Sequence, residues 1–166
     1  MRGRKRGAAP GTERFADAPL DGSLLEIDEV KTQFKTPRGL VHAVDGVSFT
    51  LERGKTIGIV GESGCGKSVL SRSIMGLLPS NVVRYGSIRF EGHEIGQAKS
   101  SEMRHFWGTQ MAIVFQDAMT ALNPVMRVGQ QIMESLRFHF DVTKEYAEET
   151  ALALLTSVGI LSLIHI

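Results

Sequence analysis

Two stretches of the chain alternate apolar and polar side chains with a period of two. Val47, Phe49 and Leu51 alternate with polar residues in the first stretch, and Ile88 and Phe90 do so in the second, between two glycines. Because successive side chains of a strand point to opposite faces, this pattern predicts half-buried strands. We therefore expect an N-terminal antiparallel β subdomain.

Two other runs are short and almost continuously apolar, at residues 56–60 and 111–115. Strands that are covered on both faces in a parallel sheet have this composition. The two runs predict that an α/β core accompanies the antiparallel sheet.

Three helices are predicted from apolar residues that recur at helical spacing. The first follows a glycine-rich loop and continues until Pro79, and the second covers residues 128–140. The third begins after Thr143 as its N-cap and ends at Gly159. Its apolar face is expected to comprise Ala147, Ala151, Leu154, Leu155 and Val158.

Composition limits the possible partners and the compartment. The 166 residues carry 19 basic and 18 acidic side chains, a formal charge of +1, which provides no overall field to attract nucleic acid or an anionic membrane. We therefore expect no nucleic-acid partner. Cys65 is the single cysteine and cannot form an internal disulfide, which fits a reducing compartment such as the cytoplasm. No run approaches the ~20 apolar residues that span a bilayer.

The first residues differ from the rest of the chain. Arg2, Arg4, Lys5 and Arg6 are followed by small and polar residues without an apolar segment, so this is not a signal peptide. We interpret residues 1–23 as a disordered basic tail. Contact of this tail with nucleic acid or lipid is the less favoured alternative to a solvated terminus.

The sequence from Gly61 to Ser68 matches G-x-x-x-x-G-K-[ST], the phosphate loop also called Walker A. Glycines allow the backbone to curl so that its amides point inward, and the following helix adds its positive end. Lys67 is expected to contact the β- and γ-phosphates, and the Ser68 hydroxyl to ligate Mg²⁺. The predicted phosphate-binding residues are Gly61, Ser63, Gly64, Cys65, Gly66, Lys67, Ser68 and Val69. We interpret Cys65 as a loop residue and not a nucleophile, because no His is positioned in the sequence to suggest nucleophilic catalysis.

The stretch from Met111 to Pro124 closely resembles the Q-loop region of ATP-binding-cassette (ABC) ATPases. Together with residues 61–69 and 73–79, it looks like the oligopeptide and dipeptide importer ATPases of bacteria. The resemblance extends from about Leu24 to Gly159. It implies that residues 24–160 form part of an ABC-type P-loop NTPase domain of the α/β class, with the start of a helical subdomain, that uses ATP and Mg²⁺.

The resemblance also implies partners and further site residues. Permease membrane subunits, a second ATPase subunit and, indirectly, a solute-binding protein are expected, at the cytoplasmic face of the cell membrane. Phe34 takes the position of the aromatic residue that stacks on adenine, although an aromatic at a strand end is often only packing. Gln116 takes the position of the glutamine near Mg²⁺ and the attacking water, so we assign it metal-binding and, with Lys67, catalytic roles. The alternative for Gln116 is a turn residue that caps a strand.

Three features of the family do not appear in the 166 residues: the signature loop, the acidic strand end with its catalytic Glu, and the switch His. We therefore expect this chain to bind ATP without turning it over. Residues 161–166 are apolar where the family is polar, and they are also the translation of a transposon-end adapter used in sequencing libraries. We expect them to be non-native, the alternative being a strand that packs on the core.

Five rival interpretations differ from peptide import. A GTPase needs a base-reading Asp, which the run from Thr143 to Tyr146 lacks, and a nucleotide kinase needs an Arg-rich lid, which is not found. An ABC ATPase for another solute, or a non-transport ABC protein, remains open, as does an inert fragment that binds no nucleotide.

Overall fold

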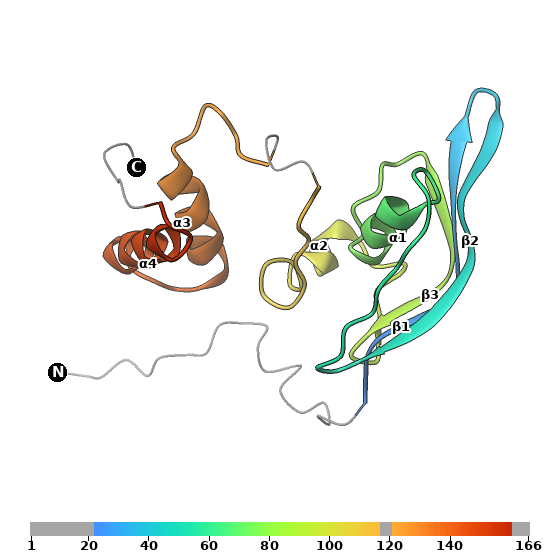
Figure 1. Cartoon of the computed structure of the whole chain (residues 1–166), viewed down its shortest axis with the longest axis horizontal. Coiled ribbons are helices and arrows are strands. Elements are labelled where there is room, and N and C mark those ends of the chain that lie inside the picture. The colour runs from blue at the N-terminus through green and yellow to red at the C-terminus, as the bar shows by residue number, and fades with distance from the viewer. Residues whose placement is uncertain (1–21, 117–120, 161–166) are drawn as a thin grey trace. The chain divides into compact units, whose positions relative to one another are not determined.

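The computed structural model describes residues 22–116 and 121–160 (Figure 1). Within these residues the chain forms two compact units, 22–107 and 108–160. The predicted tail, apart from Gly22 and Ser23, lies outside the described residues, and so does the predicted non-native end at 161–166.

The first unit is built on a four-stranded antiparallel sheet (Figure 1). Its strands are β1 (Ser23–Thr36), β2 (Gly39–Glu52), β3 (Val82–Phe90) and β4 (His93–Glu94), in the order β2-β1-β3-β4. The two period-two stretches lie in β2 and β3, so the expected antiparallel subdomain is confirmed.

Helix α1 (Lys67–Ile74) follows the glycine-rich loop and lies against β1 and β2 (Figure 1). The prediction that it continues to Pro79 was wrong. Gly76 has a φ of 67°, a left-handed conformation that ends a helix, and the amide of Leu77 donates back to the Arg72 carbonyl at 2.8 Å. A helix-terminating glycine therefore acts before the proline does.

The core of this unit lies between the sheet, α1 and the short helix α2 (Ser100–Met103). Phe90 of β3 and Phe106 meet edge to face, with ring centroids 5.9 Å apart. The buried apolar side chains are Ile27, Val30, Val44, Leu70, Met75, Ile88, Phe90, Ile95, Met103 and Phe106.

The second unit contains α3 (Val128–His139) and α4 (Lys144–Ser157), which pack against each other. Both helices are as expected, and the N-cap is confirmed because the Thr143 hydroxyl accepts from the Tyr146 amide at 3.2 Å. The predicted apolar face of α4 is only partly correct. Its buried members Ala147, Ala151 and Leu155 recur every four residues, whereas Leu154 and Val158 are 51% and 71% exposed. The contact with α3 covers a single stripe of α4, and these two residues lie beside that stripe.

The two continuously apolar runs are not strands in the structure. Residues 56–60 and 112–115 have no regular secondary structure, and Val60 and Val114 are 92% and 96% exposed. A parallel strand forms only when neighbouring strands accept and donate its backbone hydrogen bonds. Among the residues that the structure describes, no sheet strand pairs with either run. The two runs have the composition of buried strands, but the predicted strand pairing is not seen in the described residues.

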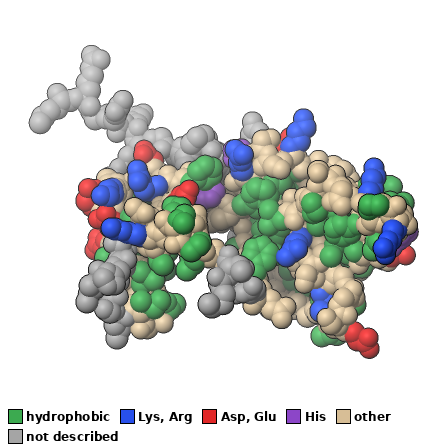
Figure 2. Space-filling view, turned by 90° about the horizontal axis from the view of Figure 1, so that it is seen from above, with side chains coloured by type: hydrophobic (Ala, Val, Ile, Leu, Met, Phe, Trp, Pro, Cys, Tyr) green, Lys and Arg blue, Asp and Glu red, His purple; other side chains and the backbone are tan. Residues whose placement is uncertain are grey.

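Apolar side chains also reach the surface elsewhere, between charged ones (Figure 2). Within the described ranges, no helix has the length and apolar character needed to cross a bilayer.

Candidate phosphate-binding site

The glycine-rich loop ends at the open amino terminus of α1. The helical ladder begins with the bond from the Leu70 amide to the Gly66 carbonyl, at 2.8 Å, so the amides from Gly66 to Val69 have no partner within the helix. No acidic side chain lies in the first turn to neutralise this end. The loop therefore presents uncompensated amides and the positive end of the helix dipole, which together favour an anion.

Gly66 fixes this end of the helix against the sheet. It has a φ of 96°, and a Cβ at this position would overlap the carbonyl oxygen of Ala43 in β2. Only glycine allows both the left-handed backbone and the close approach. The loop therefore passes close against the backbone of β2 at the start of α1.

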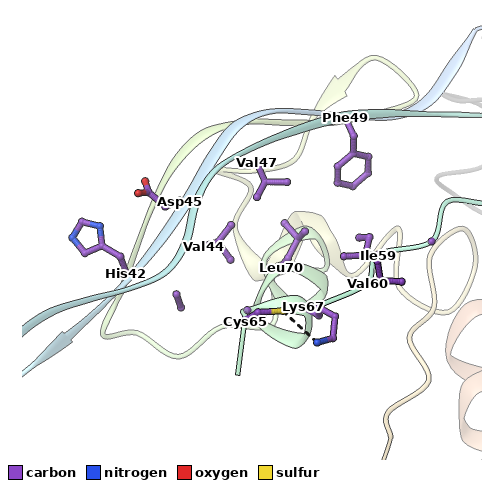
Figure 3. A pocket seen from close by; sticks show the side chains of 13 residues that line it. His42, Val44, Asp45, Val47, Phe49, Ile59, Val60, Cys65, Lys67 and Leu70 are labelled. Carbon is purple, nitrogen blue, oxygen red and sulfur yellow. Dashed lines mark hydrogen bonds between the residues drawn. The ribbon is translucent and has the colours of Figure 1, made fainter. Parts of the chain in front are cut away.

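Lys67 folds back over the loop. Its Nζ donates to the carbonyls of Gly61 and Glu62, both at 2.7 Å, and to Cys65 Sγ at 3.3 Å, the bond that is dashed in Figure 3. An ammonium group has three donors, so the loop itself can occupy all of them. The longest of the three contacts is to sulfur, a weak acceptor. A phosphate oxygen is a stronger acceptor and would replace it at small cost.

The loop lies at the rim of a cavity of about 640 Å³ (Figure 3). Val44, Val47 and Phe49 of β2 form one wall, and Ile59 and Leu70 lie opposite. Cys65 and Lys67 also line the cavity. The site thus combines a polar loop with an apolar interior beside it.

The predicted residues fall into three places. Gly61, Ser63, Gly64, Cys65, Gly66, Lys67, Ser68 and Val69 are brought together in the loop and first helical turn. Phe34 is half-buried in β1, paired with Val41 and Val82, and does not line the cavity. Gln116 lies in the second unit, where its side chain is exposed.

The carboxyl-terminal end of α1 carries a polar cluster that the sequence patterns did not identify. Thr32 of β1 and Ser73 of α1 are fully buried, and their hydroxyls are 2.8 Å apart. Arg84 Nη1 donates to the Ser73 carbonyl at 3.0 Å, and Trp107 Nε1 donates to the Met75 carbonyl at 2.9 Å. Burial lowers the pKa of the Arg84 guanidinium, while the charge of Glu94 opposes this shift. A polar residue three positions after buried Leu70 was the available signal, since it falls on the inward face of the helix.

Glu94 closes the β3–β4 hairpin. Its Oε1 accepts from the amides of Gly96 and Ile88, at 2.8 and 3.2 Å, and its other oxygen accepts from the Ser87 hydroxyl. Burial raises the pKa of the Glu94 carboxyl, but these hydrogen bonds and the nearby Arg89 charge outweigh burial, so its pKa lies below the ordinary value.

The structure thus holds a glycine-rich loop that enters a helix lying against an antiparallel sheet. A family model described as "ABC transporter" matches residues 44–165. The chain therefore belongs to the ABC transporter family, and the expected fold class is confirmed.

Among curated relatives, the chain is 45% identical over 139 residues to the oligopeptide transport ATP-binding protein OppD of Bacillus subtilis (strain 168), covering 82% of this chain and 39% of that protein. It is 46% identical over 139 residues to the dipeptide transport ATP-binding protein DppD of the same organism, covering 82% of this chain and 42% of the relative. The chain thus spans about two fifths of the length of these relatives.

A solved structure shares the fold. The ATP-binding cassette MJ0796, in a dimeric post-hydrolysis state bound to ADP and Pi, superposes with a TM-score of 0.69 at 21% identity. The match covers 80% of this chain and 56% of that chain. At this identity the similarity concerns the fold alone.

Proposed function

We propose that this chain is the nucleotide-binding portion of a subunit that binds and hydrolyses ATP to power import of oligopeptides or dipeptides across the bacterial cytoplasmic membrane. The observation that supports it best is the loop: the uncompensated amides of Gly66 to Val69 and the ammonium of Lys67, which folds over the loop, lie together at the amino terminus of α1. Family membership and the names of the two peptide-transport relatives support the class of solute.

The loop residues have distinct roles in this proposal. Lys67 leaves the Cys65 sulfur and contacts the β- and γ-phosphates, while the loop amides hold the remaining oxygens. The Ser68 hydroxyl, exposed in the first turn, ligates Mg²⁺. Phe34 stacks on adenine, and Gln116 contacts Mg²⁺ and orients the attacking water.

The proposed assembly follows from the same family. The whole protein acts at the cytoplasmic face of the membrane with permease subunits and a second ATPase subunit, and a solute-binding protein delivers the peptide. Import of another solute by the same machinery is the second candidate, because an ATPase subunit does not itself contact the solute.

Nucleotide binding can be measured on this chain by titration calorimetry with MgATP. Lys67→Ala removes a charge-assisted contact worth about 1.5–3 kcal/mol, so the affinity should fall at least about tenfold. Lys55→Ala, at an exposed position outside the loop, is the matched control and should bind like the parent. Equal affinity of the Lys67→Ala and Lys55→Ala variants would contradict the phosphate-binding role.

The peptide-import role requires the whole protein, reconstituted in vesicles with its membrane subunits and solute-binding protein. Addition of a short peptide should stimulate ATP hydrolysis and accumulate the peptide. Stimulation by a different solute class but not by peptides would favour the second candidate.

A further inference from the structure

Helix α1 is fixed at its two ends by different contacts. At the amino terminus the backbone of Gly66 lies against the Ala43 carbonyl of β2. At the carboxyl terminus the Ser73 carbonyl accepts from Arg84, the Met75 carbonyl accepts from Trp107, and the Ser73 hydroxyl pairs with that of Thr32. Eight residues span about 12 Å, so a tilt of about 10° at one end moves the other by about 2 Å.

The contacts at the carboxyl-terminal end are suited to fixing the tilt of α1 against the sheet. The Thr32 and Ser73 hydroxyls are 0% exposed, so neither can exchange its partner for water. Arg84 contributes a charged donor at a helix carboxyl terminus, where a cation is favoured electrostatically. Since Thr32 belongs to β1 and Arg84 to β3, the helix is tied to two strands of the sheet.

We propose that Arg84 and the Thr32–Ser73 hydroxyl pair are positioning residues for the phosphate loop. They set the tilt of α1, and the tilt sets where Lys67 and the first-turn amides meet the phosphates. This inference rests on the proposed function, because it assumes that the loop binds phosphates. Productive phosphate contacts require placement within about 0.5 Å, which is less than the displacement estimated above.

The first test compares Arg84→Met with Arg89→Met by titration calorimetry of the 166-residue chain, with inorganic tripolyphosphate and MgATP as probes. Arg89 is an exposed arginine on the same strand, so its variant controls for the loss of one charge. Arg84→Met should weaken both ligands by about tenfold, by equal factors, since both use the loop. Arg84→Lys keeps the charge and an N–H donor group and should recover part of the affinity.

If Arg84 only stabilised the fold, its replacement would give a different calorimetric result. It would reduce the number of binding sites per chain, because some molecules unfold, and leave the Kd of the folded molecules unchanged. That result, or an equal loss in Arg84→Met and Arg89→Met, would overturn the inference. If the parent chain binds neither probe, the proposed function fails instead, which separates the two claims.

A second variant keeps the test decisive if Arg84→Met does not fold. The double variant Thr32→Val with Ser73→Ala removes both hydroxyls, so no buried polar group is left without a partner and folding is largely retained. We expect a folded protein with full stoichiometry and several-fold weaker tripolyphosphate binding. Parental affinity in this folded variant would show that the hydroxyl pair does not position the loop.

Discussion

Replacing Gly66 by alanine should destabilise the first unit through two separable effects. The backbone at Gly66 has a φ of 96°, which is left-handed and strained for any residue with a side chain. The added Cβ would also overlap the Ala43 carbonyl oxygen and lie 3.4 Å from its carbonyl carbon and 3.6 Å from Val44 Cγ2. The two Ala43 atoms belong to the backbone of β2, so they cannot rotate out of the way.

The two effects can be estimated one at a time. The left-handed conformation costs about 1–2 kcal/mol for alanine. Forcing an extra methyl against fixed atoms costs about a further 1–3 kcal/mol. Gly64→Ala isolates the first effect, because Gly64 has a φ of 83° and a Cβ there would meet no atom within 4 Å. We therefore expect Gly66→Ala to lose about 2–5 kcal/mol and Gly64→Ala about 1–2 kcal/mol.

Urea unfolding followed by tryptophan fluorescence measures both variants. Trp107 is the single tryptophan of the chain and is bonded to the Met75 carbonyl beside the end of α1, so it reports on this unit. The difference between the variants gives the steric contribution. Equal losses of unfolding free energy would refute the close approach of the loop to β2.

Four other changes give measurable results. MgATP should slow maleimide labelling of Cys65, because phosphate binding closes the loop beside the thiol; an unchanged rate would count against it. Gln116→Ala in the reconstituted transporter should leave ATP affinity largely intact and lower coupled hydrolysis, whereas equal loss of both would make the residue structural. Thr143→Ala should cost α4 about 1 kcal/mol in a thermal melt followed by circular dichroism, more than Thr150→Ala on the same helix. Because the pKa of Glu94 is lowered on folding, its stabilisation is present above the ordinary carboxyl pKa and is lost as pH falls through the folded value; Glu94→Gln should flatten this part of a stability-pH profile.

Sequence patterns correctly predicted the elements whose stabilising contacts lie within a few residues or repeat regularly along a strand. Alternation identified β2 and β3, because each buries one face of an antiparallel sheet. The cap at Thr143 was predictable because its acceptor and donor are three residues apart. The prediction of strands at 56–60 and 111–115 was wrong for the opposite reason. A parallel strand forms only beside neighbouring strands, and the composition of a short run does not show whether these neighbours are present. The prediction for the end of α1 was wrong because Gly76, with its left-handed backbone, ends the helix before Pro79 is reached.

In the candidate site, too, the residues that are close in sequence were predictable and those that are far apart were not. The loop was predictable because its glycines, Lys67 and Ser68 act within eight consecutive residues, and the structure gathers them at one helix terminus. The residues that hold the other end of that helix were not, since Thr32 and Ser73 are 41 positions apart and meet only after the sheet and helix have packed. A buried hydroxyl must find a partner, which for Ser73 on the inward face of α1 is either a carbonyl of its own helix or a polar residue on the sheet opposite. The sequence could indicate that such a partner exists, whereas identifying it as Thr32 required the register of β1 against the helix.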